Sequence, residues 1–113
     1  MTDCLFCKII NKEIPSEIIY EDQAVLCFKD INPVAPVHLL IIPKKHLRDL
    51  NSAEQADQSL LGRILLIMPK LAVEVGIAQS GYRVVANNGP DAGQIVEHLH
   101  FHLIGGQMSA DFA

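Results

Sequence analysis

Hydrophobic and polar residues alternate most regularly over residues 98–104, where the chain reads His-Leu-His-Phe-His-Leu-Ile. Because successive side chains of a β-strand point to opposite faces, His98, His100 and His102 are expected on one face, about 6.5–7 Å apart. A helix would scatter the same residues around its circumference. The pattern therefore predicts a strand with one apolar face to bury and one face of imidazoles.

Four shorter runs rich in isoleucine, valine and leucine lie between turn residues and predict further strands. Together with the histidine strand they make an antiparallel sheet, and with two predicted helices the fold class is α+β. The chain of 113 residues, half of them hydrophobic, has room for a single domain over residues 1–113. The four runs lie at about residues 17–21, 24–29, 37–43 and 82–87.

The two helices differ in length. Asp3 has the position of an N-cap for a short helix over about residues 4–11, which ends before Pro15. Residues 52–55, Ser-Ala-Glu-Gln, match a capping box and open a long helix that runs to about Ala78. The apolar residues of the short helix that are expected to face the core are Leu5, Phe6, Ile9 and Ile10.

The long helix is apolar over more of its circumference than one sheet face can cover. Its main stripe consists of Leu60, Ile64, Ile67, Leu71 and Val75, and beside it lie Leu61, Leu65, Met68 and Ala72. A second buried face implies a partner.

Composition excludes several classes of function. A net charge of −4 gives no general attraction to nucleic acid polymers or to anionic membranes, so any phosphate binding has to be local. No segment offers the ~20 apolar residues that a membrane span needs, and residues 1–4 do not resemble a secretory signal. Three cysteines, an odd number, argue against a disulfide framework and favour a reducing cytoplasm.

Three imidazoles on one strand face suit more than one kind of site. They repel one another when protonated, so an ordinary amphipathic strand would lose stability by this arrangement. Zinc is one possible ligand, but a straight strand holds His98 and His102 too far apart for one ion. The alternative is an anion site, in which a neutral imidazole attacks phosphorus while its neighbours donate hydrogen bonds to phosphate oxygens.

The loop before the histidine strand favours the anion site. Residues 87–94 read Asn-Asn-Gly-Pro-Asp-Ala-Gly-Gln and can turn backbone N–H groups toward an anion. Asn-Gly is also a common hairpin signal, so a plain turn is the alternative. Joined to the three histidines, the loop is interpreted as a phosphate cradle.

Residues 98–104 resemble the His-φ-His-φ-His-φ-φ signature of the histidine triad (HIT) family, in which φ is apolar. The resemblance extends from about Cys4 to Gly106 and is to the Hint-like branch, which hydrolyses purine nucleoside phosphoramidates. It implies a five-stranded antiparallel sheet with two helices and a homodimer. In relatives the C-terminal tail reaches the partner's site and tunes substrate choice, and the corresponding tail here, residues 107–113, is brief. The further matching segments are residues 8–15, 28–33, 35–38, 42–46 and 81–85.

The resemblance implies that His100 is the catalytic nucleophile, which forms a nucleotidyl-histidine that water then hydrolyses. His38 and His102 would flank the phosphate as donors, and the backbone amides of residues 93–95 would neutralise the growing negative charge. From the chain alone, a core or edge histidine is an equally good interpretation of His38.

The resemblance also implies a set of nucleotide-binding residues. The carboxylate of Asp30 can accept from both ribose hydroxyls, although an ordinary surface turn would explain it too. Ile14, Phe28 and Ile31 resemble the walls of the purine pocket, and core packing would explain them equally well. Ile95 stands where close relatives often have a serine that assists the leaving group. The full expected set is Phe28, Asp30, Ile31, Asn87, Gly93, Gln94, Ile95, His100 and His102.

Cys4 and Cys7 suggest a second site, for structural zinc. Three residues apart on a helix, their thiols share one face, and zinc needs two further ligands. The resemblance to a subset of the family supplies these from His46 and His98, which would make His98 structural. Two small buried hydrophobes without a metal are the alternative, and a redox pair fits poorly because no thioredoxin-like pattern surrounds it.

The expected function is hydrolysis of the P–N bond of purine nucleoside 5′-phosphoramidates, with no cofactor for catalysis. The alternatives are a dinucleoside polyphosphate hydrolase or nucleotidyl transferase, and a nucleotide-binding interaction module with incidental catalysis. The short chain and the context of residues 43–46, Pro-Lys-Lys-His, favour the first. The expected partners are a purine nucleotide and a second copy of the chain.

Overall fold

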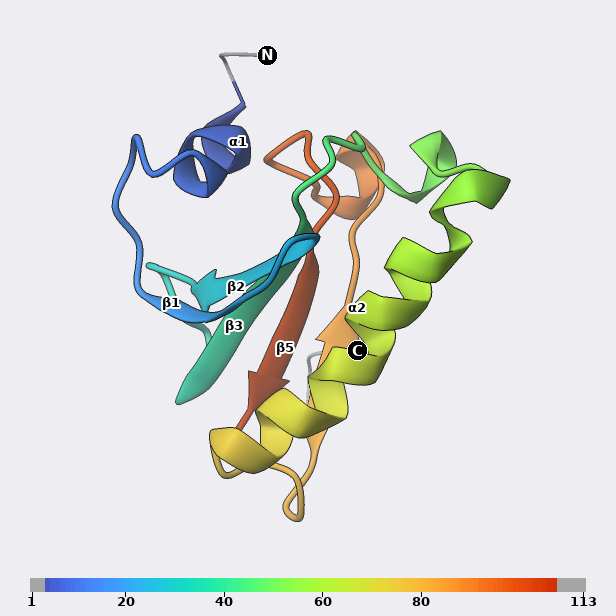
Figure 1. Ribbon diagram of the computed structural model, residues 1–113. Helices are drawn as coiled ribbons and strands as arrows, with labels where there is room; N and C mark the ends of the chain where they lie inside the picture. The colour runs from blue at the N-terminus through green and yellow to red at the C-terminus, as the bar shows by residue number, and fades with distance from the viewer. Residues whose placement is uncertain (1–3, 108–113) are drawn as a thin grey trace.

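The computed structural model describes residues 4–107, and within these residues five antiparallel strands form one sheet in the order β1-β2-β3-β5-β4 (Figure 1). Two α-helices accompany the sheet in this part of the chain, so the predicted α+β fold is confirmed. No helix among these residues is long and apolar enough to span a membrane. The elements are α1 (Leu5–Ile10), β1 (Ile18–Glu21), β2 (Val25–Lys29), β3 (Val37–Pro43), α2 (Gln58–Glu74), β4 (Tyr82–Val85) and β5 (Phe101–Gly105).

The alternation of side chains gives the sheet two different faces. On one face, Val25, Cys27, Leu39, Ile41 and Leu103 pack against α2. On the other face, Leu26, Phe28, Leu40 and Ile42 pack against Phe6 and Ile9 of α1. Because Leu40 is paired with His102 across β3 and β5, this second face is also the one on which the histidines gather.

The first helix is shorter than predicted and is capped by a different residue. The Sγ of Cys4 accepts a hydrogen bond from the backbone N–H of Cys7, 3.3 Å away, while Asp3 lies outside the described residues. Phe6 is buried as expected, but Leu5 is 43% exposed. Leu5 faces outward because its side chain borders a surface pocket rather than the core.

The long helix begins later and ends earlier than predicted. Two 3₁₀ turns, Leu50–Ser52 and Gln55–Asp57, precede it, and the capping box is made by Glu54 and Asp57. Ser52 is not the cap because its own N–H donates to the carboxylate of Asp49. The helix ends at Glu74, not at Ala78, because Gly76 turns the chain with a φ of 81°.

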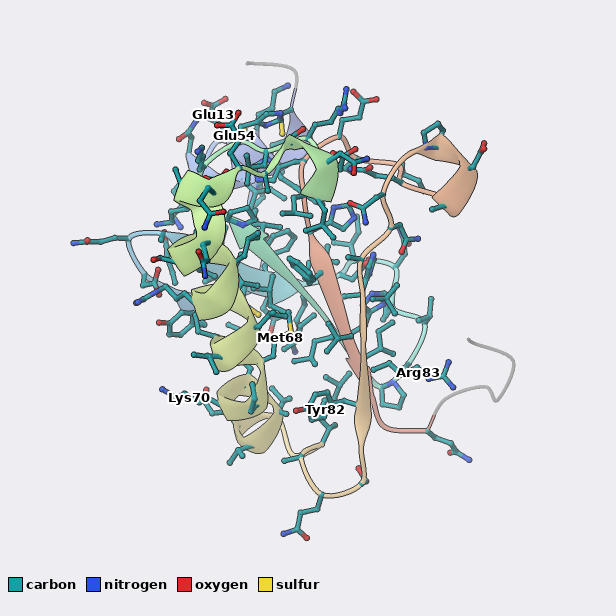
Figure 2. All side chains as sticks on the ribbon, turned by 90° about the vertical axis from the view of Figure 1, so that its right-hand side faces the viewer. Glu13, Glu54, Met68, Lys70, Tyr82 and Arg83 are labelled. Atoms are coloured by element: carbon teal, nitrogen blue, oxygen red, sulfur yellow. The ribbon has the colours of Figure 1, made fainter. Side chains whose placement is uncertain are left out.

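The sheet covers more of the helix α2 than the sequence predicts, since Met68 and Ala72, which were expected beyond the reach of one sheet face, are buried in the core. Met68 points toward the sheet, whereas Lys70 points away from it (Figure 2). The outer side carries three exposed apolar side chains: Leu65, Leu66 and Val73. The second copy that would cover them stays a prediction.

The histidine strand also differs from the prediction in its bounds. The strand β5 begins at Phe101, so His98 and His100 precede it. The backbone there no longer pairs with β3, which ends at Pro43. Instead the N–H of Leu99 donates to the carbonyl of Leu47, 2.6 Å away. The three histidines consequently reach two different sites.

Candidate active site and metal centre

A pocket of about 390 Å³ opens on the α1 face of the sheet. Its volume lies within the range of small-molecule sites in proteins. Its lining includes the polar residues Asp30, Asn87, His100 and His102. Much of the remaining lining is apolar and includes Leu5, Phe6, Ile9, Ile14, Phe28 and Ile31. A ligand with one flat apolar part and one charged part would match this mixed lining.

The ring of His100 is held in one orientation in the lining of the pocket. Its Nδ1 lies 2.7 Å from the carbonyl oxygen of His98. A carbonyl can only accept, so Nδ1 carries the proton and the neutral ring has its lone pair on Nε2. The ring is 7% exposed and stands edge to face with Phe6, with 5.1 Å between centroids. His100 therefore offers Nε2 as a nucleophile.

A relay of defined direction lies beside His100. The backbone N–H of Val34 donates to Nδ1 of His38, 3.2 Å away, so neutral His38 carries its proton on Nε2. That atom lies 2.9 Å from Nδ1 of His102 and 3.3 Å from a carboxylate oxygen of Asp30. Nδ1 of His102 accepts this proton's hydrogen bond, and Nε2 of His102 is then an N–H donor.

The environment keeps both rings of the relay neutral. Burial lowers the pKa of His38, and the carboxylate of Asp30 only partly offsets this. Burial, together with the rings of His100 and His38, lowers the pKa of His102 to about 4. The donor atoms of Asp30, His38 and His102 are near enough for a metal ion. The proton that Val34 fixes on Nε2 of His38 makes this trio a hydrogen-bond relay instead.

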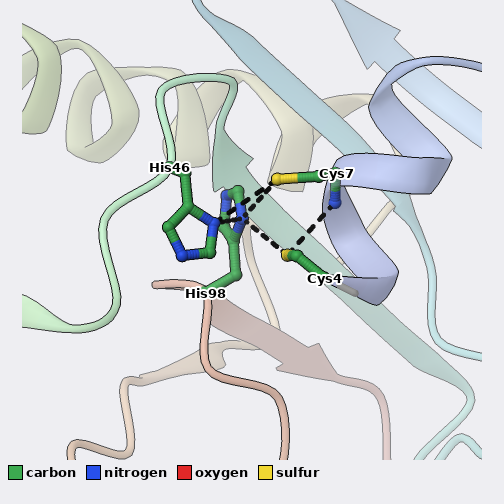
Figure 3. Close-up of side chains that lie close together, drawn as sticks. All are labelled: Cys4, Cys7, His46 and His98. Atoms are coloured by element: carbon green, nitrogen blue, oxygen red, sulfur yellow. Dashed lines mark hydrogen bonds between the residues drawn. The ribbon is translucent and has the colours of Figure 1, made fainter. Parts of the chain in front are cut away.

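The four predicted zinc ligands lie together at the end of α1 (Figure 3). The Sγ of Cys4 lies 3.3 Å from Nδ1 of His98, and the Sγ of Cys7 lies 3.4 Å from Nδ1 of His46. The two Nδ1 atoms are 3.1 Å apart, and Cys7 is 3.7 Å from His98. A tetrahedral zinc ion with these ligands requires separations of roughly 3.3–3.8 Å, so the distances from the sulfurs match and the two Nδ1 atoms are slightly closer together.

The hydrogen bonds around the cluster also suit a metal. Nε2 of His98 donates to the carbonyl of Pro43, 2.8 Å away, which leaves the lone pair of Nδ1 directed at the sulfurs. Burial, with a contribution from Cys4, raises the pKa of Cys7 to about 11. A metal ion would displace the thiol proton. The donor set therefore fits zinc, and His98 belongs to this cluster rather than to the relay.

The comparisons with known proteins agree with this geometry. A family model described as the HIT domain matches residues 11–109. An uncharacterized HIT-like protein of Synechocystis is 50% identical over 105 residues, 93% of this chain and 91% of that protein. The chain belongs to the HIT domain family.

Solved structures of HIT proteins have the same fold. A HIT family hydrolase from Clostridium thermocellum has a TM-score of 0.95 at 46% identity, covering 100% of this chain and 99% of that one. A histidine triad nucleotide-binding protein from Candida albicans has a TM-score of 0.82 at 35% identity, covering 98% and 86%.

Most of the expected nucleotide-binding residues of this HIT domain line the pocket. Ile31 and Ile95 are 87% and 90% exposed there, so core packing does not explain them. Phe28 is buried and serves both the core and the pocket wall. Gln94 is the exception, because its side chain is bonded to the carbonyls of Arg48 and Val96 and lines a neighbouring cavity.

The expected cradle of backbone amides is only partly available in the HIT domain. The N–H of Gly93 donates to Pro90, and the N–H of Gln94 donates to Gly89, so both are used inside the loop. Over residues 4–107, the N–H of Ile95 has no hydrogen-bond partner. A short 3₁₀ turn, Pro90–Ala92, causes this difference because it turns the loop's donors back on itself.

Several contributors to the site were not predicted from the sequence. They are the N–H of Val34, the carbonyls of Pro43 and His98, and the ring of Phe6, which contacts His98 and His100. Backbone groups carry no residue-specific signal, so the N–H and the two carbonyls could not be identified. The sequence predicted that Phe6 faces inward. Its position between Cys4 and Cys7 was the only signal of a role beyond core packing.

Proposed function

We propose that this HIT domain hydrolyses the P–N bond of purine nucleoside 5′-phosphoramidates, with His100 as nucleophile. The observation that carries the proposal is the 2.7 Å hydrogen bond from Nδ1 of His100 to the carbonyl of His98. It leaves the lone pair on Nε2, as in-line attack on phosphorus requires. The descriptions of related structures as a hydrolase and as a nucleotide-binding protein support a reaction on a nucleotide.

In the first step, Nε2 of His100 bonds to the α-phosphorus and the P–N bond to the amine breaks. The departing amine takes a proton from solvent. The N–H of His102, oriented by His38, and the free amide of Ile95 donate to the phosphate oxygens, where negative charge grows. The product of this step is a nucleotidyl-histidine.

In the second step, water attacks phosphorus, the bond between phosphorus and Nε2 of His100 breaks, and the water proton passes to solvent. The nucleoside monophosphate leaves and the lone pair returns to Nε2. Nδ1 keeps its proton throughout because the carbonyl of His98 holds it. Two steps with a good leaving group each replace one hard displacement.

The rest of the pocket positions the nucleotide. One oxygen of Asp30 accepts from the N–H of Asn32, and the other lies 3.3 Å from Nε2 of His38. The side chain is 18% exposed, and each carboxylate oxygen has two lone pairs, so it can also accept from ribose hydroxyls. The purine would lie against the apolar walls, with Phe28 at the base and Ile31 at the rim. Burial of a flat ring between such side chains contributes much of the affinity.

Two further features belong to the proposal. Cys4, Cys7, His46 and His98 would hold a structural zinc ion, which when bound cross-links α1 to the segments after β3 and before β5. The exposed apolar face of α2, Leu65, Leu66 and Val73, would meet a second copy of the chain. Neither feature takes part in a chemical step.

A turnover assay tests the proposal. Adenosine 5′-phosphoramidate and diadenosine tetraphosphate are incubated with the protein and with His100→Ala, and AMP release is followed. We expect faster release from the phosphoramidate, and a loss of about 10³-fold or more in the variant. Faster cleavage of the tetraphosphate would favour a dinucleoside polyphosphate hydrolase. Tight AMP binding without turnover of either substrate would indicate a binding module.

A further inference from the structure

The candidate metal cluster and the nucleophile are in physical contact through one side chain. Phe6 lies on α1 between Cys4 and Cys7 and is 4% exposed. Its ring packs against His98 of the cluster, with 5.9 Å between centroids, and against His100, with 5.1 Å. A third contact, at 5.5 Å, is with Phe28 in the wall of the pocket. Phe6 therefore touches the cluster, the nucleophile and the pocket together.

The contact with His100 restrains that ring. The planes of Phe6 and His100 are 89° apart, an edge-to-face geometry favoured by aromatic pairs. Within residues 4–107, the only hydrogen bond of the His100 side chain is the one from Nδ1 to the carbonyl of His98. One hydrogen bond fixes one nitrogen, and a packed neighbour is needed to hold the ring against rotation.

The position of Phe6 depends on how α1 is held. A helix of six residues is unstable by itself, so its place is set by tertiary contacts. These contacts are the apolar packing of Phe6 and Ile9 and the thiols of Cys4 and Cys7 at the two histidines. A metal ion that joins the four donors would fasten both ends of the first helical turn on which Phe6 stands.

We propose that Phe6 is a positioning residue that transmits closure of the Cys4–Cys7–His46–His98 cluster to the ring of His100. When the four ligands of the cluster are joined, the ring of Phe6 packs against His100 and holds its tautomer and orientation, with Nε2 toward the pocket. With the cluster open, α1 loosens and the ring samples other orientations. The consequence of this positioning for turnover rests on the proposed function, whereas the effect of Phe6 on the ring of His100 does not.

The experiment reads the ring nitrogens of His100 by NMR in protein labelled with ¹⁵N at histidine, and His100→Ala assigns the signals. Phe6→Leu removes the aromatic ring, and Ile10→Ala is the matched control. Ile10 is on the same helix and packs against the same apolar core between α1 and the sheet, but it does not line the pocket. Each protein is measured loaded with zinc and after chelation, with folding checked by circular dichroism.

In the zinc-loaded wild type and Ile10→Ala we expect one protonated and one unprotonated nitrogen. In Phe6→Leu the two signals should move toward a common average. Chelation should move the wild-type signals in the same way and change Phe6→Leu little, because the connecting side chain is already missing. Single-turnover formation of the nucleotidyl-histidine should fall about tenfold in Phe6→Leu, by more than AMP affinity falls.

Three results would overturn the proposal. One is an unchanged His100 spectrum in Phe6→Leu, and the second is an equal change in Ile10→Ala. The third is an equal effect of chelation with and without Phe6, since the cluster would then act through the backbone of His98. If the spectra behave as expected but no phosphoramidate is hydrolysed, the proposed function fails and the positioning role of Phe6 stands.

Discussion

Nε2 of His38 lies 2.9 Å from Nδ1 of His102, and both rings are buried enough to remain uncharged at neutral pH. The two residues are on neighbouring strands, β3 and β5, and are 64 positions apart in the chain. The hydrogen bond has one direction because Val34 occupies the other nitrogen of His38. Nε2 of His102 therefore carries a proton and can donate a hydrogen bond to a phosphate oxygen.

The buried neutral histidines predict a stability that depends on pH. The pKa of His102 is about 4 in the folded protein, against about 6.5 when unfolded, so the unfolded chain binds more protons between these values. The contribution of neutral His102 to the free energy of unfolding is complete above pH 6.5 and is lost as the pH falls toward 4. Urea unfolding should show a loss of about 1–3 kcal/mol over this range. His102→Gln should flatten the profile, and an equally steep profile would contradict the assignment.

Asp30 predicts how the ribose is recognised. Asp30→Asn removes a charged acceptor and should raise KM for adenosine 5′-phosphoramidate about tenfold, with a smaller effect on kcat. The matched control is Asp91→Asn, an exposed carboxylate outside the pocket, which should change neither constant. A substrate that lacks both ribose hydroxyls should be handled similarly by wild type and Asp30→Asn. A difference as large as with the ribose substrate would show that Asp30 has another role.

The cysteine cluster predicts the metal content. Protein purified without chelator should contain about one zinc ion per chain, and the double variant Cys4→Ser with Cys7→Ser should contain almost none. Cys27→Ala is the control, since this cysteine is buried in the core on the α2 side of the sheet and should leave the zinc in place. Metal analysis by mass spectrometry decides the matter. Wild type without zinc, or a double variant that retains it, would exclude the site.

The outer face of α2 predicts self-association. Leu66 is 72% exposed, and Leu66→Glu should place a charge in the expected interface and give a monomer at micromolar concentration. Gln79→Glu adds the same charge at an exposed position beyond the helix and should leave the dimer intact. Light scattering coupled to size exclusion measures both masses. A monomeric wild type would contradict the proposal that a second copy of the chain covers this face of α2.

The fold and most of the site could be predicted because local alternation determines them. The strands, the shared side of His100 and His102, and the closeness of Cys4 and Cys7 all follow from spacing along the chain. That His38 lies on this same side, next to His102, depends on the register of β3 against β5, which no local pattern fixes. The placement of His38 in the site was instead implied by the resemblance to the HIT family.

The failures of prediction have a common physical origin. The loop at Gly89 to Gln94 has the expected glycines, but which N–H groups face outward depends on a 3₁₀ turn that closes on itself. Likewise the cap of α1 and the start of β5 depend on which acceptor a backbone N–H takes, the Sγ of Cys4 for Cys7 and the carbonyl of Leu47 for Leu99. Residue types indicate which groups are present. They do not indicate which of two available partners a backbone group takes.

The central claim is that Nε2 of His100 bonds to phosphorus during turnover. Its most direct test is rapid acid-free quenching of the protein with adenosine 5′-phosphoramidate, followed by intact and peptide mass spectrometry. The account predicts an increase by one adenylate per active site, located on His100, which forms and decays at rates compatible with turnover and is absent in His100→Ala. Turnover with no adduct on this residue, or with an adduct on another histidine, would contradict it.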